Sequence, residues 1–145
     1  MIKEFKNQYF FLSNFYECPI YYNKLVFCNA EAAFQAQKVI DEKEQYKFIN
    51  LNASQARKLG KTIVLRKDWE EVKDNIMYEI VKRKFTVNKE LKQKLIDTKD
   101  EELVEGNWWH DTYWGVDSKT GIGKNKLGKI LMKVREEVKS SNAIN

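Results

Sequence analysis

Cysteine and histidine are scarce in this sequence, which has two cysteines, Cys18 and Cys28, and a single histidine, His110. A secreted disulfide framework normally uses more cysteines, so we expect both thiols to be reduced, as in a cytosolic protein. No CxxC pair occurs, and a zinc site needs three or four clustered ligands. The sequence therefore predicts no metal, and a Ser-His-Asp or Cys-His site would depend on His110 alone.

Long apolar runs and leader segments are also missing. No stretch approaches the roughly 20 apolar residues that cross a bilayer, and the start, MIKEFKNQYFF, lacks the basic head, apolar run and cleavage site of a signal peptide. We therefore expect a cytoplasmic protein without membrane contact. The phosphate-binding patterns GxxxxGK[ST] and GxGxxG after a strand are absent too. GIGKNKLG can offer backbone N–H groups to an anion, or its glycines can simply shape a turn.

The composition fits one packed domain. The chain has 145 residues, of which 43% are hydrophobic, 13% aromatic and 32% charged, and this supports a core and a charged surface. We predict a single domain over 1–139, a flexible tail over 140–145, and a monomer. The net charge of +5 mildly favours anionic ligands, although a lysine-rich solvated surface gives the same total.

The hydrophobic pattern predicts an α+β fold, predominantly helical with a few short strands. Asn29, Asp68 and Asn88 are expected helix N-caps and Gly60 an expected C-cap. We expect a hairpin over 19–29, a strand over 102–107, and helices over about 30–41, 42–51, 54–60, 69–85, 88–98 and 124–138.

A row of polar side chains interrupts the alanine-rich helix that begins at Ala30. Glu31, Gln35 and Lys38 stand at positions i, i+4 and i+7, which places them on one side of a helix. One interpretation is an amphipathic helix whose polar row faces water. The other is that the row lines a pocket.

Two further stretches concentrate aromatic and polar residues. WWHDTYWG, residues 108–115, holds three tryptophans and an acid in what reads as a loop; its rings can stack on a flat base, or they can fill the core beneath the loop. FFLSNFY, residues 10–16, surrounds Ser13 and Asn14 with aromatics. These two can line a pocket or stabilise a turn.

Taken in order, the motifs of this chain resemble the YbiA-like or NADAR family over nearly the whole length. The resemblance is carried by FLSNFY (11–16), Glu31 with QAQK (35–38), ARKLGK (56–61), DW (68–69), KF (84–85) with Asn88, LVEGN (103–107), DTYWG (111–115) and GKNKLGKILMKVR (123–135). One departure is Lys61, where many members have arginine; lysine offers a phosphate a point charge instead of a two-pronged grip.

The resemblance implies a mostly helical α+β fold and an N-glycosidase, which cleaves the bond between a base-like nitrogen and C1 of a ribose. One branch of the family hydrolyses early ribosylamino intermediates of riboflavin biosynthesis, and another removes ADP-ribose from guanine in nucleic acid. The implied substrate is therefore a small ribosylamino phosphate or ADP-ribosylated guanine. Nucleic acid is expected only as a substrate, and no cofactor is required.

The resemblance also implies roles for individual residues. Lys38 matches a lysine proposed as the nucleophile in the ADP-ribosyl branch, and Glu31 on the same helix would be its acid/base. Glycoside hydrolysis commonly divides its tasks between two carboxylates, and Asp111 would be the second, orienting sugar or water. The predicted substrate-binding residues are Ser13, Asn14, Phe15, Gln35, Trp109, Trp114, Gly115 and Asn125.

Two other classes of function remain open from the sequence. A module that senses NAD or ADP-ribose without turnover would use the same pocket, but it would not need Lys38 or Glu31 for chemistry. A nucleic-acid binder would show tight, salt-dependent binding to plain DNA or RNA. The lysines are scattered along the chain, which argues against a dedicated binding stripe.

Overall fold

The computed structural model describes residues 1–144, and helices dominate it, which confirms the predicted α+β class. The chain forms two compact units. The first unit comprises residues 1–13 and 85–145, and the second comprises residues 14–84. The boundary falls inside the long helix α4, Trp69–Val87.

The second unit begins with the expected hairpin, formed by strands β1 (Glu17–Tyr22) and β2 (Leu25–Asn29) in antiparallel pairing. Asn23 and Lys24 make the turn with φ of 51° and 73°, as a tight two-residue hairpin turn of this hand requires. The register shifts between Glu17 and Ile20, where Pro19 has no N–H to donate to the ladder.

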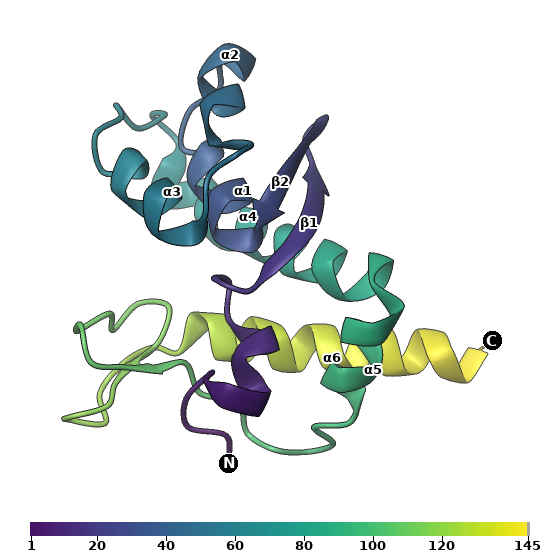
Figure 1. Cartoon of the computed structure of the whole chain (residues 1–145). Helices are drawn as coiled ribbons and strands as arrows, with labels where there is room; N and C mark the ends of the chain where they lie inside the picture. Colours follow the sequence, from purple (N-terminus) through teal and green to yellow (C-terminus); the bar gives the residue numbers. More distant parts are fainter. Residues whose placement is uncertain (145) are drawn as a thin grey trace. The chain divides into compact units, whose positions relative to one another are not determined.

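Three helical segments follow the hairpin before α4. They are α1 (Ala30–Ala36), α2 (Glu42–Gln45) continued by the 3-10 turn η2 (Tyr46–Phe48), and α3 (Ala53–Gly60). Helix α1 packs against both hairpin strands and against α3, as Figure 1 shows in its blue and teal part. Asn29 caps α1 through a 2.7 Å bond from the Ala32 N–H to its side-chain oxygen, as predicted.

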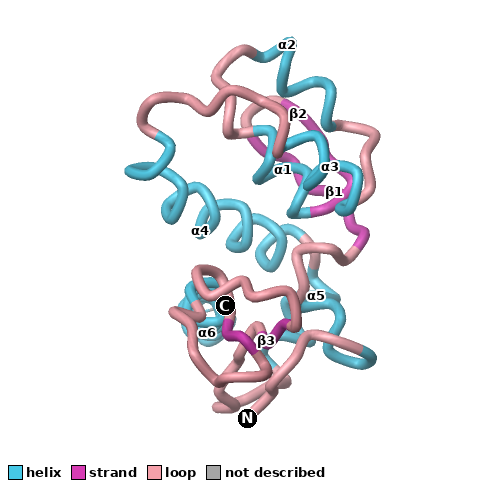
Figure 2. The backbone as a smooth tube through the Cα atoms, turned by 90° about the vertical axis from the view of Figure 1, so that its left-hand side faces the viewer, coloured by secondary structure: helices cyan, strands magenta, loops and turns pink. Residues whose placement is uncertain are grey.

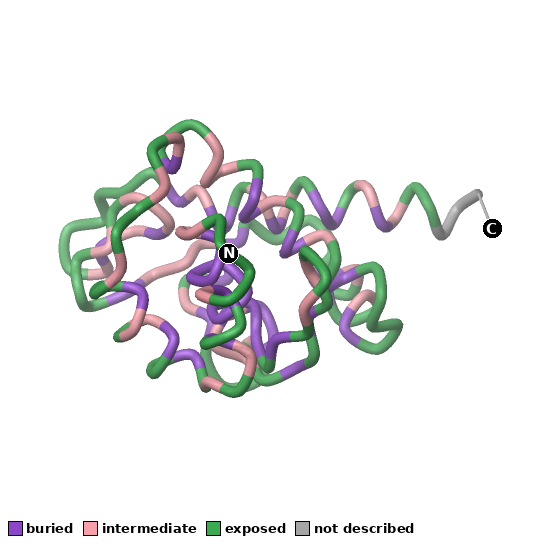
Figure 3. Tube along the Cα trace, turned by 90° about the horizontal axis from the view of Figure 1, so that it is seen from above, coloured by how far each residue is buried: buried purple, intermediate pink, exposed green. Residues whose placement is uncertain are grey.

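The first unit consists of the 3-10 helix η1 (Asn7–Leu12), helix α5 (Lys89–Ile96), strands β3 (Gly106–Asn107) and β4 (Val116–Asp117), and helix α6 (Lys126–Ile144). The two short strands pair in parallel. Much of the chain between α5 and α6 is loop, drawn in pink in Figure 2. Buried and exposed residues alternate along α6 (Figure 3). Leu127, Leu131 and Val134 lie in the core, whereas Ile130 is only half-buried.

Several expected boundaries were wrong. Helix α1 ends at Ala36 rather than near residue 41, the strand expected over 102–107 is reduced to Gly106–Asn107, and α4 continues two residues past 85. Gly60 is the last residue of α3 and Lys61 is its C-cap, with an ordinary φ of −75°. Helix α6 enters the segment predicted as a flexible tail, whose last residue, Asn145, lies outside the described residues.

No helix within residues 1–144 combines the length and the apolar composition needed to cross a membrane. The same residues contain no group of three or more His, Cys, Asp or Glu side chains arranged to hold a metal ion.

Candidate active site

The polar row of α1 lies in the interior of the second unit. All seven residues of α1 are buried, and Glu31 and Gln35 keep only 9% and 6% of their surface exposed. The interpretation that the row faces water is therefore wrong for these two positions. Burying a carboxylate is costly unless it interacts with charged or polar groups.

Lys38 follows α1 in a turn instead of belonging to the helix. Its N–H donates to the Gln35 carbonyl at 3.2 Å, and its own carbonyl accepts the Arg66 N–H at 2.8 Å. The Gln37 side chain closes the end of the helix by donating to the Ala33 carbonyl at 3.1 Å. These bonds fix the backbone at Lys38, so its side chain starts from a defined position beside Gln35.

The surroundings of Lys38 lower the pKa of its amine. Burial lowers the pKa of Lys38 below its usual 10.5, and the Glu31 carboxylate opposes that shift by favouring the charged form. The positive charges of Arg57, Lys61 and Lys73 lower the pKa further. Lys38 is half-buried, and partial burial near other cations is the kind of environment that makes a lysine a better nucleophile.

Asn14 and Phe15 border the start of α1. The Asn14 carbonyl accepts the N–H of Glu31 at 3.0 Å, and its buried side-chain amide donates to the Met77 sulfur at 3.3 Å. The Phe15 ring lies under the guanidinium of Arg57, 5.8 Å from the ring centroid. The predicted residues Asn14, Phe15, Glu31, Gln35 and Lys38 thus belong to one unit and are tied to α1 or its neighbours.

Gln35 packs directly against α3. A Cβ at position 60 would overlap the Gln35 side-chain oxygen, so glycine is needed there for space. That oxygen is buried, and among the described residues it has no hydrogen-bond partner. An unpaired buried carbonyl costs free energy, and such atoms occur where a structure accepts strain or where a ligand completes the bonding.

The aromatic loop of the first unit is organised around Asn107, which is fully buried. Its side chain accepts the Asp111 N–H at 2.9 Å and donates to the Asp111 carbonyl at 2.9 Å. The Asp111 carboxylate then accepts the N–H groups of Tyr113 and Trp114, both at 3.0 Å and both through the same oxygen. Asp111 therefore shapes the loop through one carboxylate oxygen. The predicted contact with sugar or water would use its other oxygen.

The predicted stacking residues of this loop differ in exposure. Trp109 is 57% exposed, whereas Trp114 is half-buried and its ring meets that of Tyr113 edge-on at 4.9 Å. Gly115 is buried, and a Cβ there would overlap both the backbone and the side chain of Glu105. A packing requirement therefore accounts for the glycine, and its predicted contact with substrate stays a prediction.

Four hydrogen bonds join this loop to the start of α6. The carbonyls of residues 112–115 accept the N–H groups of residues 124–127 at 2.8 to 3.2 Å. The first N–H groups of a helix have no partner within it, so the loop supplies what the helix lacks. The bonds also hold the predicted site residues Asp111, Trp114 and Gly115 in a fixed frame.

Asn125 and Ser13 have defined structural bonds. The Asn125 side chain accepts the Glu105 N–H at 3.0 Å and donates to the Leu103 carbonyl at 2.9 Å, and its backbone has φ of 50°. The Ser13 N–H donates to the Phe10 carbonyl at the end of η1. The predicted contacts of both residues with phosphate or ribose stay predictions.

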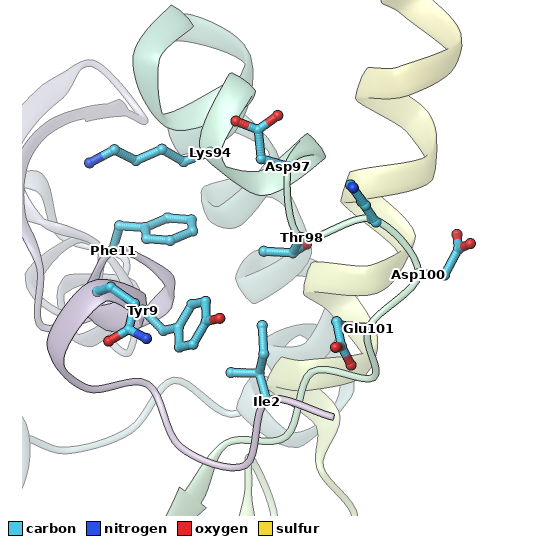
Figure 4. Close-up of a pocket in the computed structure, with 10 residues that line it drawn as sticks. Ile2, Tyr9, Phe11, Lys94, Asp97, Thr98, Asp100 and Glu101 are labelled. Atoms are coloured by element: carbon cyan, nitrogen blue, oxygen red, sulfur yellow. The ribbon is translucent and has the colours of Figure 1, made fainter.

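Each unit also has an open groove lined by none of the predicted residues. The groove of the first unit has a volume of about 850 Å³, with Ile2, Tyr9 and Phe11 along one side (Figure 4). Lys94 lies over the Phe11 ring at 5.8 Å. The groove of the second unit, about 650 Å³, includes Tyr22 and Arg66. Basic and acidic residues are mixed in both grooves, so neither selects a ligand by charge.

Sequence reasoning gave Asn107 and Arg57 no role in the site, and it treated Gly60 only as a helix C-cap. Nothing in a single sequence distinguishes the Asn107 amide from an ordinary surface asparagine. The sequence did contain a signal for Arg57: it stands four residues before Lys61, so the two basic side chains share one side of the helix. The predicted pairing of Glu31 with Asp111 joins residues of different units and stays a prediction.

The family model of the NADAR domain matches residues 2–139, and the chain belongs to that family. This confirms the resemblance drawn from the motifs.

Among the most similar relatives is N-glycosidase YbiA of Escherichia coli (strain K12), which is 37% identical over 129 residues covering 87% of this chain and 79% of that protein. Riboflavin biosynthesis protein VVA0006 of Vibrio vulnificus is 39% identical over 131 residues, covering 88% of this chain but only 35% of that protein. The NMR structure of the E. coli protein YbiA aligns with a TM-score of 0.85 and 32% identity, covering 100% of this chain and 90% of that chain.

Proposed function

We propose that this protein, an N-glycosidase like its YbiA relatives, hydrolyses a ribosyl C–N bond in a phosphorylated ribosylamino compound. The observation that carries the proposal is the pair Lys38 and Glu31: a lysine whose pKa is lowered by burial, interacting with a carboxylate that is itself 9% exposed. Early riboflavin-biosynthesis intermediates belong to this substrate class, and a relative is named a riboflavin biosynthesis protein.

The proposed reaction begins when the ribose ring opens. The C1–O4 bond breaks, its electron pair goes to O4, and the nitrogen lone pair forms a C=N bond to C1. Glu31 donates the proton that O4 takes up, as a general acid. The opened sugar then presents an electrophilic carbon to an amine.

Lys38 is the proposed nucleophile at that carbon. Its neutral amine adds to C1, and a proton passes from the lysine nitrogen to the departing nitrogen. The bond from C1 to the base then breaks, and its electron pair leaves with the base as a neutral amine. Lys38 and C1 remain joined as a protonated Schiff base. Water adds to C1, the lysine leaves, and ribose phosphate is released.

The other predicted residues have proposed supporting roles. Gln35 contacts a sugar hydroxyl, and Ser13, Asn14 and Phe15 contact the ribose or its phosphate. Asp111 orients sugar or water, Trp109 and Trp114 stack on base or sugar, and Gly115 and Asn125 complete the substrate-binding set. No cofactor enters this scheme, and the protein is proposed to act as a monomer.

Borohydride trapping tests the proposal directly. The protein is incubated with the ribosylaminopyrimidine phosphate or, in a second arm, with ADP-ribosyl-guanine DNA, and sodium borohydride is added during turnover. We expect a covalent adduct on the peptide that contains Lys38, together with release of the base. Lys38→Ala should lose both, and Glu31→Gln should lose release.

Lys58→Ala is the matched control, because Lys58 is an exposed lysine of the same unit. Release that persists in Lys38→Ala would contradict the assignment of the nucleophile. The arm that gives release identifies the substrate branch. Binding of ADP-ribose with no release from either substrate would replace the enzyme proposal with a sensor of that ligand.

A further inference from the structure

Three cations surround the turn that carries Lys38, and the proposed reaction does not use them. Arg57 and Lys61 stand one helical turn apart on the same side of α3. Lys73 lies on α4 with its side chain 15% exposed, and it pairs with Glu70. All three charges act on the Lys38 amine.

The packing of α3 against α1 explains why these charges meet. Gly60 allows the last turn of α3 to touch Gln35, and Lys61 follows directly as the C-cap. Arg57, one turn earlier, lies over the ring of Phe15. The residue before Phe15 accepts the N–H of Glu31. These contacts join Arg57 to the chain beside Glu31, and they place Lys61 directly after the residue that packs against Gln35.

The local charge balance is positive. Arg57, Lys61 and Lys73 contribute three positive charges near the Lys38 amine, whereas among the described residues Glu31 is the carboxylate that acts on that amine and Glu70 pairs with Lys73. Lys61 is exposed and makes no ion pair within residues 1–144. The helix dipole favours basic residues near a helix C-terminus. It does not explain why the charges of Arg57 and Lys61 both act on the Lys38 amine.

We propose that Arg57 and Lys61 bind the phosphate group of the ribosyl substrate and make the enzyme selective for phosphorylated compounds. The inference rests on the proposed function and assigns the phosphate end of that same site. A guanidinium binds two phosphate oxygens through parallel N–H groups, and lysine adds a compact charge. Lys73 is already paired with Glu70, so the proposal does not assign it to the phosphate.

Ribose 5-phosphate is the probe, because it carries the sugar and the phosphate without the base. Binding is measured by calorimetry for the unmodified protein, Arg57→Gln, Lys61→Ala and Lys58→Ala. We expect affinity to fall about 10- to 100-fold in Arg57→Gln and Lys61→Ala, the usual effect of losing a charged hydrogen bond. Lys58→Ala removes a charge from the same helix and should leave affinity unchanged. Arg57→Lys, which keeps the charge, should recover part of the loss.

Ribose without phosphate separates phosphate recognition from sugar recognition. It should bind weakly, and with the same affinity to all variants. Equal losses for ribose and ribose 5-phosphate, or an equal loss in Lys58→Ala, would overturn the assignment. Thermal unfolding of each variant checks that the fold is kept. If Arg57→Gln does not fold, Arg57→Lys tests the role of Arg57 in phosphate binding.

A turnover assay distinguishes failure of this inference from failure of the proposed function. If the enzyme hydrolyses phosphorylated and dephosphorylated ribosylamines equally well, the function stands and the phosphate site is refuted. If neither is hydrolysed, but ribose 5-phosphate binding still depends on Arg57 and Lys61, the phosphate site stands and the proposed reaction is refuted.

Discussion

Replacement of Lys84 should change how stability depends on pH. Lys84 is 2% exposed, and burial lowers its pKa from 10.5 to about 8. This difference corresponds to a cost of about 3 kcal/mol for keeping the ammonium inside the folded protein. Its Nζ lies over the ring of Tyr16, 5.5 Å from the ring centroid.

The sign follows from proton linkage. Below pH 8 both folded and unfolded states carry the proton, and the full cost is present. Between pH 8 and 10.5 the folded state loses the proton while the unfolded state keeps it, so the free energy of unfolding rises with pH. Lys84→Met removes the titrating group. The unmodified protein should therefore gain up to about 3 kcal/mol relative to Lys84→Met across this window.

Urea unfolding followed by tryptophan fluorescence, at closely spaced pH values from 7 to 10, measures the effect. Burial raises the pKa of the nearby Cys18 thiol, which lowers stability as pH rises and opposes the Lys84 effect. The comparison is therefore repeated in a Cys18→Ala background. Parallel curves for the unmodified protein and Lys84→Met would refute the reasoning, since they would mean that Lys84 titrates normally.

Three other substitutions test the frame of the site by chemical denaturation. Asn107→Ala removes the buried amide that binds Asp111 on two sides, and should cost about 1–3 kcal/mol; an unchanged midpoint would contradict its role in the loop. Gly60→Ala should cost about 1–3 kcal/mol through overpacking against Gln35, and the cost should shrink in a Gln35→Ala background. Asn29→Ala removes the cap of α1 and should cost about 1–2 kcal/mol.

Local signals in the sequence predicted the beginnings of elements better than their ends. The caps at Asn29 and Asn88 accept the bonds expected of them, because a cap acts within four residues of itself. The turn after α1 is held by Arg66, whose N–H bonds the Lys38 carbonyl from 28 positions along the chain. No local pattern encodes such a partner.

In the candidate site too, local spacing could be predicted from the sequence, whereas burial and long-range contacts could not. The spacing of Glu31 and Gln35 indicated a shared side of one helix, and the structure confirms that geometry. Whether that side is wet or buried was undecidable from α1 alone, since burial comes from its packing against α3 and the hairpin. The aromatic loop could be located by composition, but the Asn107 amide that shapes it could not.

In the loop that bonds the start of α6, the backbone and the side chains have different roles. The backbone carbonyls hold the helix, while side chains such as that of Trp109 remain exposed and take no part in those bonds. Exposure alone does not make a position of this loop exchangeable, because the exposed side chains of Trp108 and His110 bond Glu4 and Asp117. For an engineer, Trp109 is the position of this loop to vary first, because the backbone bonds to α6 do not depend on its side chain.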